Sequence, residues 1–334
     1  MKSAVKGHIA AAAVMIIWGL TFVSSDLVLV AGVNTVELLL VRFGLGWLLL
    51  LVLRPKIPAF RSIRAEAPFA LCGLFGVVLY YAGEYTALRL TLVSTVGILV
   101  ATAPLFTAFL SWAVYKKKPT KLFLAGFVLA LAGIVLVGVS GSAGGGEVST
   151  STPAIRLLGD LLALLAAFTW AVYSVVYLKI GNPNPDSPSN PNPNPNPDSP
   201  SDPNPNPDNS VKAHAASGDP VLATRRIFFY GVIMLLAGLP FLGIHPNWAL
   251  YARPVVWGNL LFLACIATAL GYVAWNYAIN QLGELRSSAY LYGIPVVTLL
   301  GSVVVLHEPF TWPAAVGIIL ITIGLILSER SHRT

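Results

Sequence analysis

The sequence predicts an all-α membrane protein in which ten transmembrane helices form two inverted five-helix repeats. Three observations lead to this fold class: a shortage of charged residues, a series of long apolar stretches, and an internal sequence repeat. The chain has 334 residues, of which 56% are hydrophobic and only 10% are charged. Soluble domains carry about 25% charged residues, so most of this chain is expected to avoid water.

The apolar stretches place the helices. A helix needs about 20 mostly apolar residues to cross a bilayer, and lipid offers no partner for a free backbone amide. Helices are therefore the expected spanning elements. Ten such stretches occur, near residues 8–30, 34–53, 66–88, 92–115, 121–140, 157–180, 221–244, 255–280, 285–306 and 312–329.

The formal net charge of +7 is interpreted as a topology signal rather than as a sign of nucleic-acid binding. If the N-terminus is cytoplasmic, seventeen of the 21 Lys and Arg residues fall in cytoplasmic segments. Only Arg89, Arg156 and Arg253 fall outside, and Arg42 lies within a helix. Positive residues collect on the cytoplasmic side of membrane proteins. The split predicts a multi-pass protein of the cell membrane, of the bacterial inner-membrane type, with both termini cytoplasmic.

Two parts of the chain repeat each other. Gly7 and Trp18 match Gly159 and Trp170 at an offset of 152 residues. Five later pairs share an offset of 191: Tyr81/Tyr272, Pro104/Pro295, Thr120/Thr311, Gly126/Gly317 and Gly133/Gly324. Five ordered matches at one offset indicate a duplication. Because each half holds five helices, an odd number, the second half is expected to be inverted. Many secondary transporters have this layout, with the substrate site between the halves near the midplane.

The second half contains an insertion. Arg42 aligns with Arg225 at an offset of 183, so 31 residues are gained between Trp170 and Arg225. Most of the gained residues are 182–209, NPNPDSPSNPNPNPNPDSPSDPNPNPDN. Alternating proline there prevents both helix and sheet, and none of these residues can build a core. The predicted organisation is a first repeat over 1–140, a Gly/Ser-rich external linker over 141–156, and a second repeat over 157–330. Residues 182–209 form a disordered cytoplasmic loop within that repeat.

A set of short motifs resembles the EamA-type transporters of the drug/metabolite transporter superfamily. The motifs are Trp18-Gly-Leu-Thr-Phe, Arg42-Phe, Ala103-Pro104-Leu105-Phe106, Gly293-Ile-Pro295, His307-Glu308-Pro309 and the Gly126/Gly133 and Gly317/Gly324 pairs. The resemblance covers both halves except the Asn-Pro insertion. It implies a ten-helix inverted-repeat fold and the export or exchange of small solutes, amino acids among them. One departure is Lys117-Lys118-Pro119, which stands in the first half where the second has Glu308-Pro309.

No motif indicates catalysis or a cofactor. The phosphate-binding pattern GxxxxGK[ST] is absent, as are HExxH and GxSxG, and the five histidines fall near helix ends or in loops. We therefore expect no enzyme activity, no cofactor and no metal. The expected partners are a small-molecule substrate and the lipid bilayer, with no nucleic acid. The predicted function is secondary transport of small metabolites by alternating access, with a channel or an intramembrane enzyme as the alternatives.

Two ionisable residues inside the predicted helices are site candidates, because such residues are expensive in a membrane. Arg42 could neutralise a carboxylate, or it could hold the fold by bonding carbonyls between helices. Glu84, beside Tyr80 and Tyr81, could bind an ammonium group or a proton, or it could reach outward to the interface.

Aromatic residues gather in the third, sixth, eighth and ninth predicted helices. Interfacial belts explain some of them, but residues in the middle of helices could line a pocket for a solute that is part apolar and part polar. The substrate-site candidates are Trp18, Tyr80, Tyr81, Glu84, Trp170, Tyr173, Tyr272, Trp275, Asn276, Tyr290 and Arg42.

Prolines and glycines suggest moving and packing positions. Pro104 and Pro295 lie inside the predicted fourth and ninth helices, where they could act as hinges or as simple packing kinks. Gly126 and Gly133 recur at helical spacing on the fifth helix, as Gly317 and Gly324 do on the tenth. Small residues let helices approach closely, so these positions predict packing within the chain or the face of a homodimer.

Overall fold

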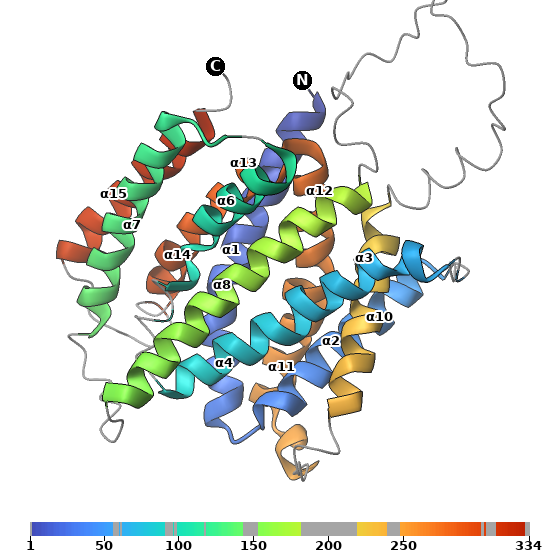
Figure 1. Cartoon of the computed structure of the whole chain (residues 1–334). Helices are drawn as coiled ribbons and strands as arrows, with labels where there is room; N and C mark the ends of the chain where they lie inside the picture. The colour runs from blue at the N-terminus through green and yellow to red at the C-terminus, as the bar shows by residue number, and fades with distance from the viewer. Residues whose placement is uncertain are drawn as a thin grey trace, which may run out of the picture.

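The computed structural model describes residues 2–55, 62–90, 99–116, 118–142, 153–181, 219–238, 248–301 and 312–330, with the single residues 60, 96 and 304. Every regular element in these ranges is a helix (Figure 1). The predicted loop at 182–209, most of the predicted linker and the His307-Glu308-Pro309 motif lie outside the described residues.

The first half of the chain forms a helix or helical segment in each of its five predicted ranges. These are α1 (Lys2–Val30), α2 (Thr35–Leu53), α3 (Ile63–Gly73) with η1 (Leu74–Leu79) and α4 (Tyr80–Leu90), α6 (Ala103–Tyr115) and α7 (Lys121–Ser142). The segment η1 is a π-helical turn that joins α3 to α4 without a break. The third predicted range is therefore helical throughout, with one wider turn in it.

The second half follows the same order. Its elements are α8 (Pro153–Gly181), α10 (Pro220–Gly238), η3 (Trp248–Ala252), α11 (Pro254–Leu261), η4 (Phe262–Leu270), α12 (Gly271–Leu282), α13 (Glu284–Ala289), η5 (Tyr290–Gly293), α14 (Ile294–Gly301) and α15 (Trp312–Arg330). Here η4 is a second π-helical turn, and η3 and η5 are 3-10 helices.

Local sequence explains where several helices begin. The Asn34 side chain accepts a hydrogen bond from the amide of Val36 and caps α2. α8 begins at Pro153, four residues before the predicted start, because proline is well suited to the first turn of a helix. Between α12 and α13 the chain turns at Gly283, whose φ of 83° favours glycine.

Within the residues that the structure describes, six helices are long and apolar enough to cross a membrane. They span Ala4–Leu29, Thr35–Leu53, Ile63–Ala87, Leu157–Ile180, Pro220–Gly238 and Pro254–Leu282. Three shorter apolar helices span Ala103–Tyr115, Lys121–Leu136 and Ala315–Ser328. The all-helical, multi-span character follows from these segments, whereas the count of ten crossings stays a prediction.

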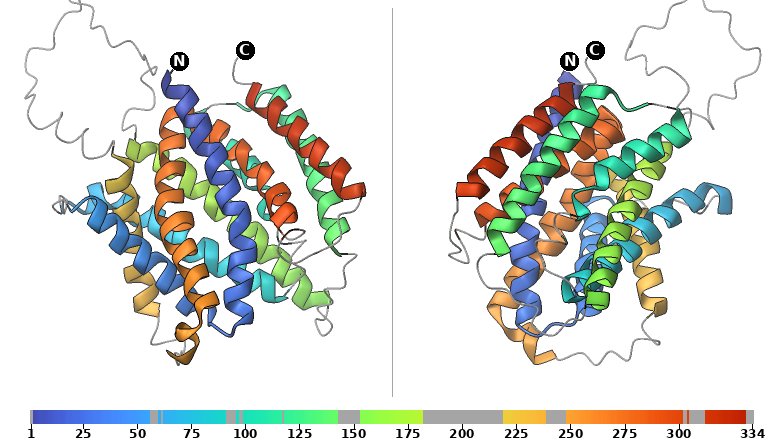
Figure 2. Two further views of the ribbon diagram at one scale, coloured as in Figure 1. Left: turned by 180° about the vertical axis from the view of Figure 1, so that it is seen from behind. Right: turned by 60° about the vertical axis from the view of Figure 1, so that its left-hand side comes forward.

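The helices pack in pairs that join the two halves. α1 lies against α12 and α14, α8 lies against α4 and α6, and α7 lies along α15 (Figure 2). The start of α1 and the end of α15 lie at the same end of the bundle (Figure 1). The arrangement brings α1, α2, α4, α8, α10 and α12 together around one buried core.

The glycines of α7 and α15 face each other within the chain. A Cβ atom added to Gly126 would lie 2.6 Å from the carbonyl oxygen of Gly324, and one added to Gly324 would lie 2.5 Å from that of Gly126. A Cβ at Gly133 would lie 2.5 Å from the carbonyl oxygen of Gly317. These glycines therefore serve intramolecular packing, and the homodimer stays a prediction that they do not support.

Candidate functional site

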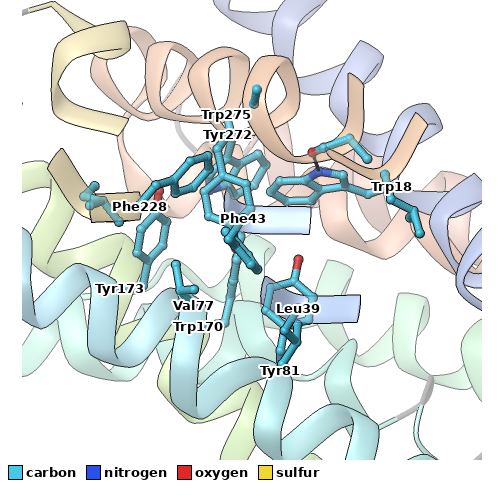
Figure 3. Close-up of a cluster of buried hydrophobic side chains, with 14 of the residues drawn as sticks. Trp18, Leu39, Phe43, Val77, Tyr81, Trp170, Tyr173, Phe228, Tyr272 and Trp275 are labelled. Carbon is cyan, nitrogen blue, oxygen red and sulfur yellow. Dashed lines mark hydrogen bonds between the residues drawn. The ribbon is translucent and has the colours of Figure 1, made fainter. Parts of the chain in front are cut away.

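A cluster of buried aromatic side chains lies where α1, α8 and α12 meet (Figure 3). The ring of Trp18 lies 5.1 Å from that of Trp170, 5.6 Å from that of Tyr272 and 5.3 Å from that of Trp275, measured between centroids. Such spacings are those of favourable aromatic pairs. Trp18 and Trp170, matched in the sequence repeat, are thus in direct contact.

Three more predicted residues extend this cluster. The centroid of Tyr80 lies 5.1 Å from that of Trp170 and 4.8 Å from that of Tyr81, and Tyr173 lies 5.1 Å from Trp170. The hydroxyl of Tyr173 donates to Asn276 Oδ1 at 2.5 Å, and Asn276 Nδ2 donates to Thr224 Oγ1 at 2.9 Å. Asn276 is therefore both buried and well bonded.

Tyr290 does not join this group of contacts. Its hydroxyl lies 2.8 Å from His8 Nδ1, near the start of α1. Ten residues separate His8 from Trp18, which corresponds to about 15 Å along a helix. The structure thus places Tyr290 toward the end of the bundle that carries the termini, away from the other candidates.

Arg42 is buried between α2 and the elements around it. Its Nε donates to Thr268 Oγ1 at 2.5 Å and its Nη1 donates to the hydroxyl of Tyr85 at 3.2 Å. Its Cζ lies 4.7 Å from the centroid of the Tyr81 ring, within the range of a cation–π contact. Arg42 therefore ties α2 to α4 and η4, and it places a positive charge at the edge of the aromatic cluster.

Glu84 lies inside the bundle. It is 5% exposed and lies beside Tyr80, and its Oε2 has no hydrogen-bond partner among the described residues. This burial does not fit the alternative in which Glu84 reaches outward to the interface. A role for Glu84 in binding an ammonium group or a proton stays a prediction.

Three polar atoms in and beside the cluster lack hydrogen-bond partners among the described residues. They are Nε1 of Trp170, Nε1 of Trp275 and Oε2 of Glu84. A buried polar atom without a partner costs about 1–3 kcal/mol, so native proteins rarely keep several together without a use for them. Two donors and one acceptor suit a solute that carries both accepting and donating groups.

The two prolines lie at the start of helices rather than inside them. Pro104 is the second residue of α6, which follows a turn at Ala101 and Thr102. Pro295 is the second residue of α14, which follows the 3-10 helix η5. Proline costs least in the first turn of a helix, where its missing amide has no partner to lose. The hinge prediction is therefore kept, but its location is corrected from helix interiors to helix starts.

Sequence reasoning missed two aromatic members of the cluster and one buried acid outside it. The ring centroids of Phe43 and Phe228 lie 5.2 Å apart, and both rings pack against Tyr272. These two rings cover the cluster on the side of α2 and α10. A comparison of the buried faces of the second and seventh predicted helices would have paired them. Glu284 was also missed. It is buried, accepts a bond from Ser111 Oγ at 2.6 Å, and lay in what looked like a short break between two spans.

No metal-binding group of three or more His, Cys, Asp or Glu side chains occurs in the part of the chain that the structure describes. The side chains gathered at the site offer aromatic faces, a few hydrogen-bonding groups, and the guanidinium of Arg42 and the carboxyl group of Glu84.

The chain is similar to several known transporters. An uncharacterized transporter of Archaeoglobus fulgidus is 25% identical over 268 residues, which is 79% of this chain and 76% of that protein. A probable amino-acid metabolite efflux pump of Salmonella typhimurium is 27% identical over 325 residues, 96% and 93% of the two chains. A similarly named pump of Escherichia coli is 25% identical over 327 residues, 97% and 94% of the two.

A solved crystal structure has the same fold. It matches with a TM-score of 0.68 at 17% identity and covers 98% of each chain. Similarity to a single transporter family is also extensive, because residues 5–139 and 214–330, on either side of the Asn-Pro insertion, both match it. The chain therefore belongs to the EamA-like transporter family.

Proposed function

We propose that this protein is a ten-helix secondary transporter that exports or exchanges small metabolites, amino acids among them, by alternating access between two inverted repeats. The observation that carries the proposal is the pairwise packing of the two halves. α1 packs against α12 and α14, and its repeat mate α8 packs against α4 and α6. These are corresponding partners, because α4 and α6 are the mates of α12 and α14. Exchange of the halves thus maps one set of contacts onto the other.

Irregular segments recur at the same offset and support the same symmetry. The π turn η1 ends at Leu79 and η4 ends at Leu270, 191 residues later. α6 begins at Ala103 and α14 begins at Ile294, again 191 residues later. Discontinuous helices at equivalent places in two halves are typical of secondary transporters, whose sites lie beside them.

Burial corrects the register of one repeat pair. The buried residues of α2 include Leu38, Leu39, Arg42, Phe43, Gly46 and Leu50, and those of α10 include Ala223, Thr224, Ile227, Phe228, Gly231 and Leu235. These six pairs share an offset of 185, not the 183 that the match of Arg42 with Arg225 suggested. Arg42 then corresponds to Ile227, so its charge belongs to the first half alone and makes the site asymmetric.

The substrate class is proposed from the site and from the relatives. Two of the relatives are named as probable amino-acid metabolite efflux pumps. The aromatic rings offer apolar faces, and the unpartnered donors and acceptor offer polar contacts. Because the rings are in mutual contact, we infer that the cluster must separate to admit a solute, as alternating access requires.

The orientation is proposed from charge. The Lys and Arg distribution favours cytoplasmic termini, and the start of α1 and the end of α15 at one end of the bundle agree with an even number of crossings.

The test is flux through the purified protein in proteoliposomes. We expect saturable uptake of one or more labelled amino acids or metabolites, accelerated by the same unlabelled solute on the other side, with protein-free vesicles as the control. Conductance that does not saturate would indicate a channel. Chemical turnover of the solute without a gradient would indicate an enzyme.

A further inference from the structure

The two π turns hold backbone carbonyls in equivalent positions. In a π turn the amide bonds to the carbonyl five residues back. The amide of Tyr80 bonds to the carbonyl of Phe75, and the amide of Gly271 bonds to that of Ile266, which are mates in the repeat. The next carbonyl in each turn, that of Gly76 and that of Ala267, accepts a hydrogen bond from a side chain.

The donors to these two carbonyls are different. Trp18 Nε1 donates to the carbonyl of Ala267 at 2.9 Å. If the halves were alike, Trp170 Nε1 would donate to the carbonyl of Gly76. That carbonyl instead accepts a bond from the hydroxyl of Tyr272 at 2.8 Å. Trp170 Nε1, in a side chain that is 4% exposed, has no partner among the described residues.

We propose that these groups form a two-position hydrogen-bond switch that accompanies alternating access; the inference rests on the proposed function. In the described state Trp18 donates a hydrogen bond to the carbonyl of Ala267, and Tyr272 donates one to the carbonyl of Gly76. In the opposite state the halves exchange conformations, so Trp170 binds the carbonyl of Gly76 and Tyr81 binds that of Ala267. Trp18 Nε1 is then the unpartnered donor.

The tyrosine pair lets the exchange occur without loss of bonds. Tyr81 and Tyr272 are repeat mates, and their hydroxyls lie near each other. Whichever hydroxyl donates to a carbonyl can accept from the other. Both states therefore satisfy both carbonyls and leave one indole N–H unpaired, so they contain the same number of these bonds. A two-state element with nearly balanced states is what a transporter needs.

One sequence difference sets the resting preference. A Cβ atom at Gly271 would lie 2.8 Å from Trp18 Nε1, so glycine there makes room for the indole. The mate of Gly271 is Tyr80, whose ring packs on Trp170. Tyr80 carries the Cβ atom that Gly271 lacks, so Trp170 must shift slightly to reach the carbonyl of Gly76. The partly buried Tyr80 ring must also turn aside first. The described state is therefore the preferred one.

The experiment measures the two populations in substrate-free protein by distances between spin labels. Both native cysteines, Cys72 and Cys265, are first replaced by alanine. One label pair sits on exposed residues at the end of the bundle that carries the termini, Val5 on α1 and Val114 on α6. A second pair sits at the other end, Leu157 on α8 and Val255 on α11. Each pair joins the group of helices packed around α1 to the group packed around α8.

Phenylalanine keeps the aromatic bulk of tryptophan and removes the N–H. Trp18→Phe should increase the opposite-state population about fivefold relative to the described state, which corresponds to about 1 kcal/mol, the usual worth of one hydrogen bond. Adding Trp170→Phe should return the distances to those of the parent protein. Tyr80→Ala should shift them in the same direction as Trp18→Phe.

Trp275→Phe is the matched control. It removes an unpartnered buried indole N–H from the same cluster, but its repeat mate is Glu84, so the switch gives it no carbonyl to bind. It should leave the distances unchanged. The switch is wrong if Trp18→Phe has no effect, if the second substitution fails to reverse it, or if Trp275→Phe produces the same shift. These outcomes leave the flux assay untouched, so a transporter without this switch is distinguishable from a protein that transports nothing.

Discussion

The contact between α7 and α15 leads to a stability prediction for Gly126→Ala. The new methyl group would lie 2.6 Å from the carbonyl oxygen of Gly324 and 2.7 Å from the amide nitrogen of Ser328. Ordinary contacts of a Cβ atom begin near 3.4 Å. Both crowded atoms belong to the backbone, so no side chain can rotate away. The helices must separate locally by about 0.8 Å, or the backbone must bend.

The expected cost follows from this geometry. Overpacking of a well-packed interface typically costs about 1–3 kcal/mol. We take about 2 kcal/mol, which should lower the melting temperature in detergent by about 4 °C in a chain of this size. Gly324→Ala should behave alike. The double variant should cost less than the sum, because residues in contact are not additive and the helices have already moved apart.

The assay is thermal unfolding of the purified protein, followed by loss of the monodisperse peak in size-exclusion chromatography. Gly44→Ala on α2 is the matched control, because no described atom lies within 4 Å of the added methyl group. It should leave the stability unchanged or raise it by up to about 1 kcal/mol, because alanine favours a helix over glycine. Equal melting temperatures for the Gly126→Ala and Gly44→Ala variants would show that α7 and α15 do not meet at these glycines.

Four further predictions test the site and the topology. Arg42→Lys should lower stability by about 1–2 kcal/mol in the same melting assay, because an ammonium cannot span the two acceptors that the guanidinium reaches; an unchanged melting point would contradict this. Trp170→Ala should weaken solute binding in the flux assay by about fivefold or more without lowering expression, as expected for loss of about 1 kcal/mol of aromatic contact; wild-type affinity would place the site elsewhere. Deletion of residues 182–209 should leave folding and transport intact, since loop length changes closure entropy by only about 0.6 kcal/mol per doubling; loss of stable protein would reveal an essential role. A cysteine that replaces Ser199 should be labelled by impermeant reagents only after the cells are opened, and labelling of intact cells would overturn the cytoplasmic assignment.

The sequence was most informative where two halves could be compared. The matches of Trp18 with Trp170 and of Tyr81 with Tyr272 led to side chains that the structure brings into one cluster. Arg42 and Arg225 are the same residue type, and aligning them gave an offset of 183. The buried positions of Phe43 and Phe228 favour an offset of 185. Tyr290 was misplaced because an aromatic residue near a predicted span says nothing about its depth.

Other features lay beyond sequence reasoning for physical reasons. A proline can kink a helix or begin one, and only the backbone around Pro104 and Pro295 decides between these outcomes. A π turn is too short to leave a detectable change in the hydrophobic periodicity, so η1 and η4 were not expected. The hydrogen bonds of the Gly76 and Ala267 carbonyls depend on those turns and were equally hidden.

The aromatic cluster also gives the protein an internal optical probe. Trp18, Trp170 and Trp275 have ring centroids 5.1, 5.3 and 6.1 Å apart, close enough for their electronic transitions to couple. Such coupling contributes to the near-ultraviolet circular dichroism and weakens steeply as rings separate. Trp112 and Trp257 are 44% and 42% exposed, so brominated lipids should quench their fluorescence. The fluorescence of the buried Trp18, Trp170 and Trp275 should not be quenched. Opening of the cluster would therefore be visible in unlabelled protein as a loss of near-ultraviolet circular dichroism.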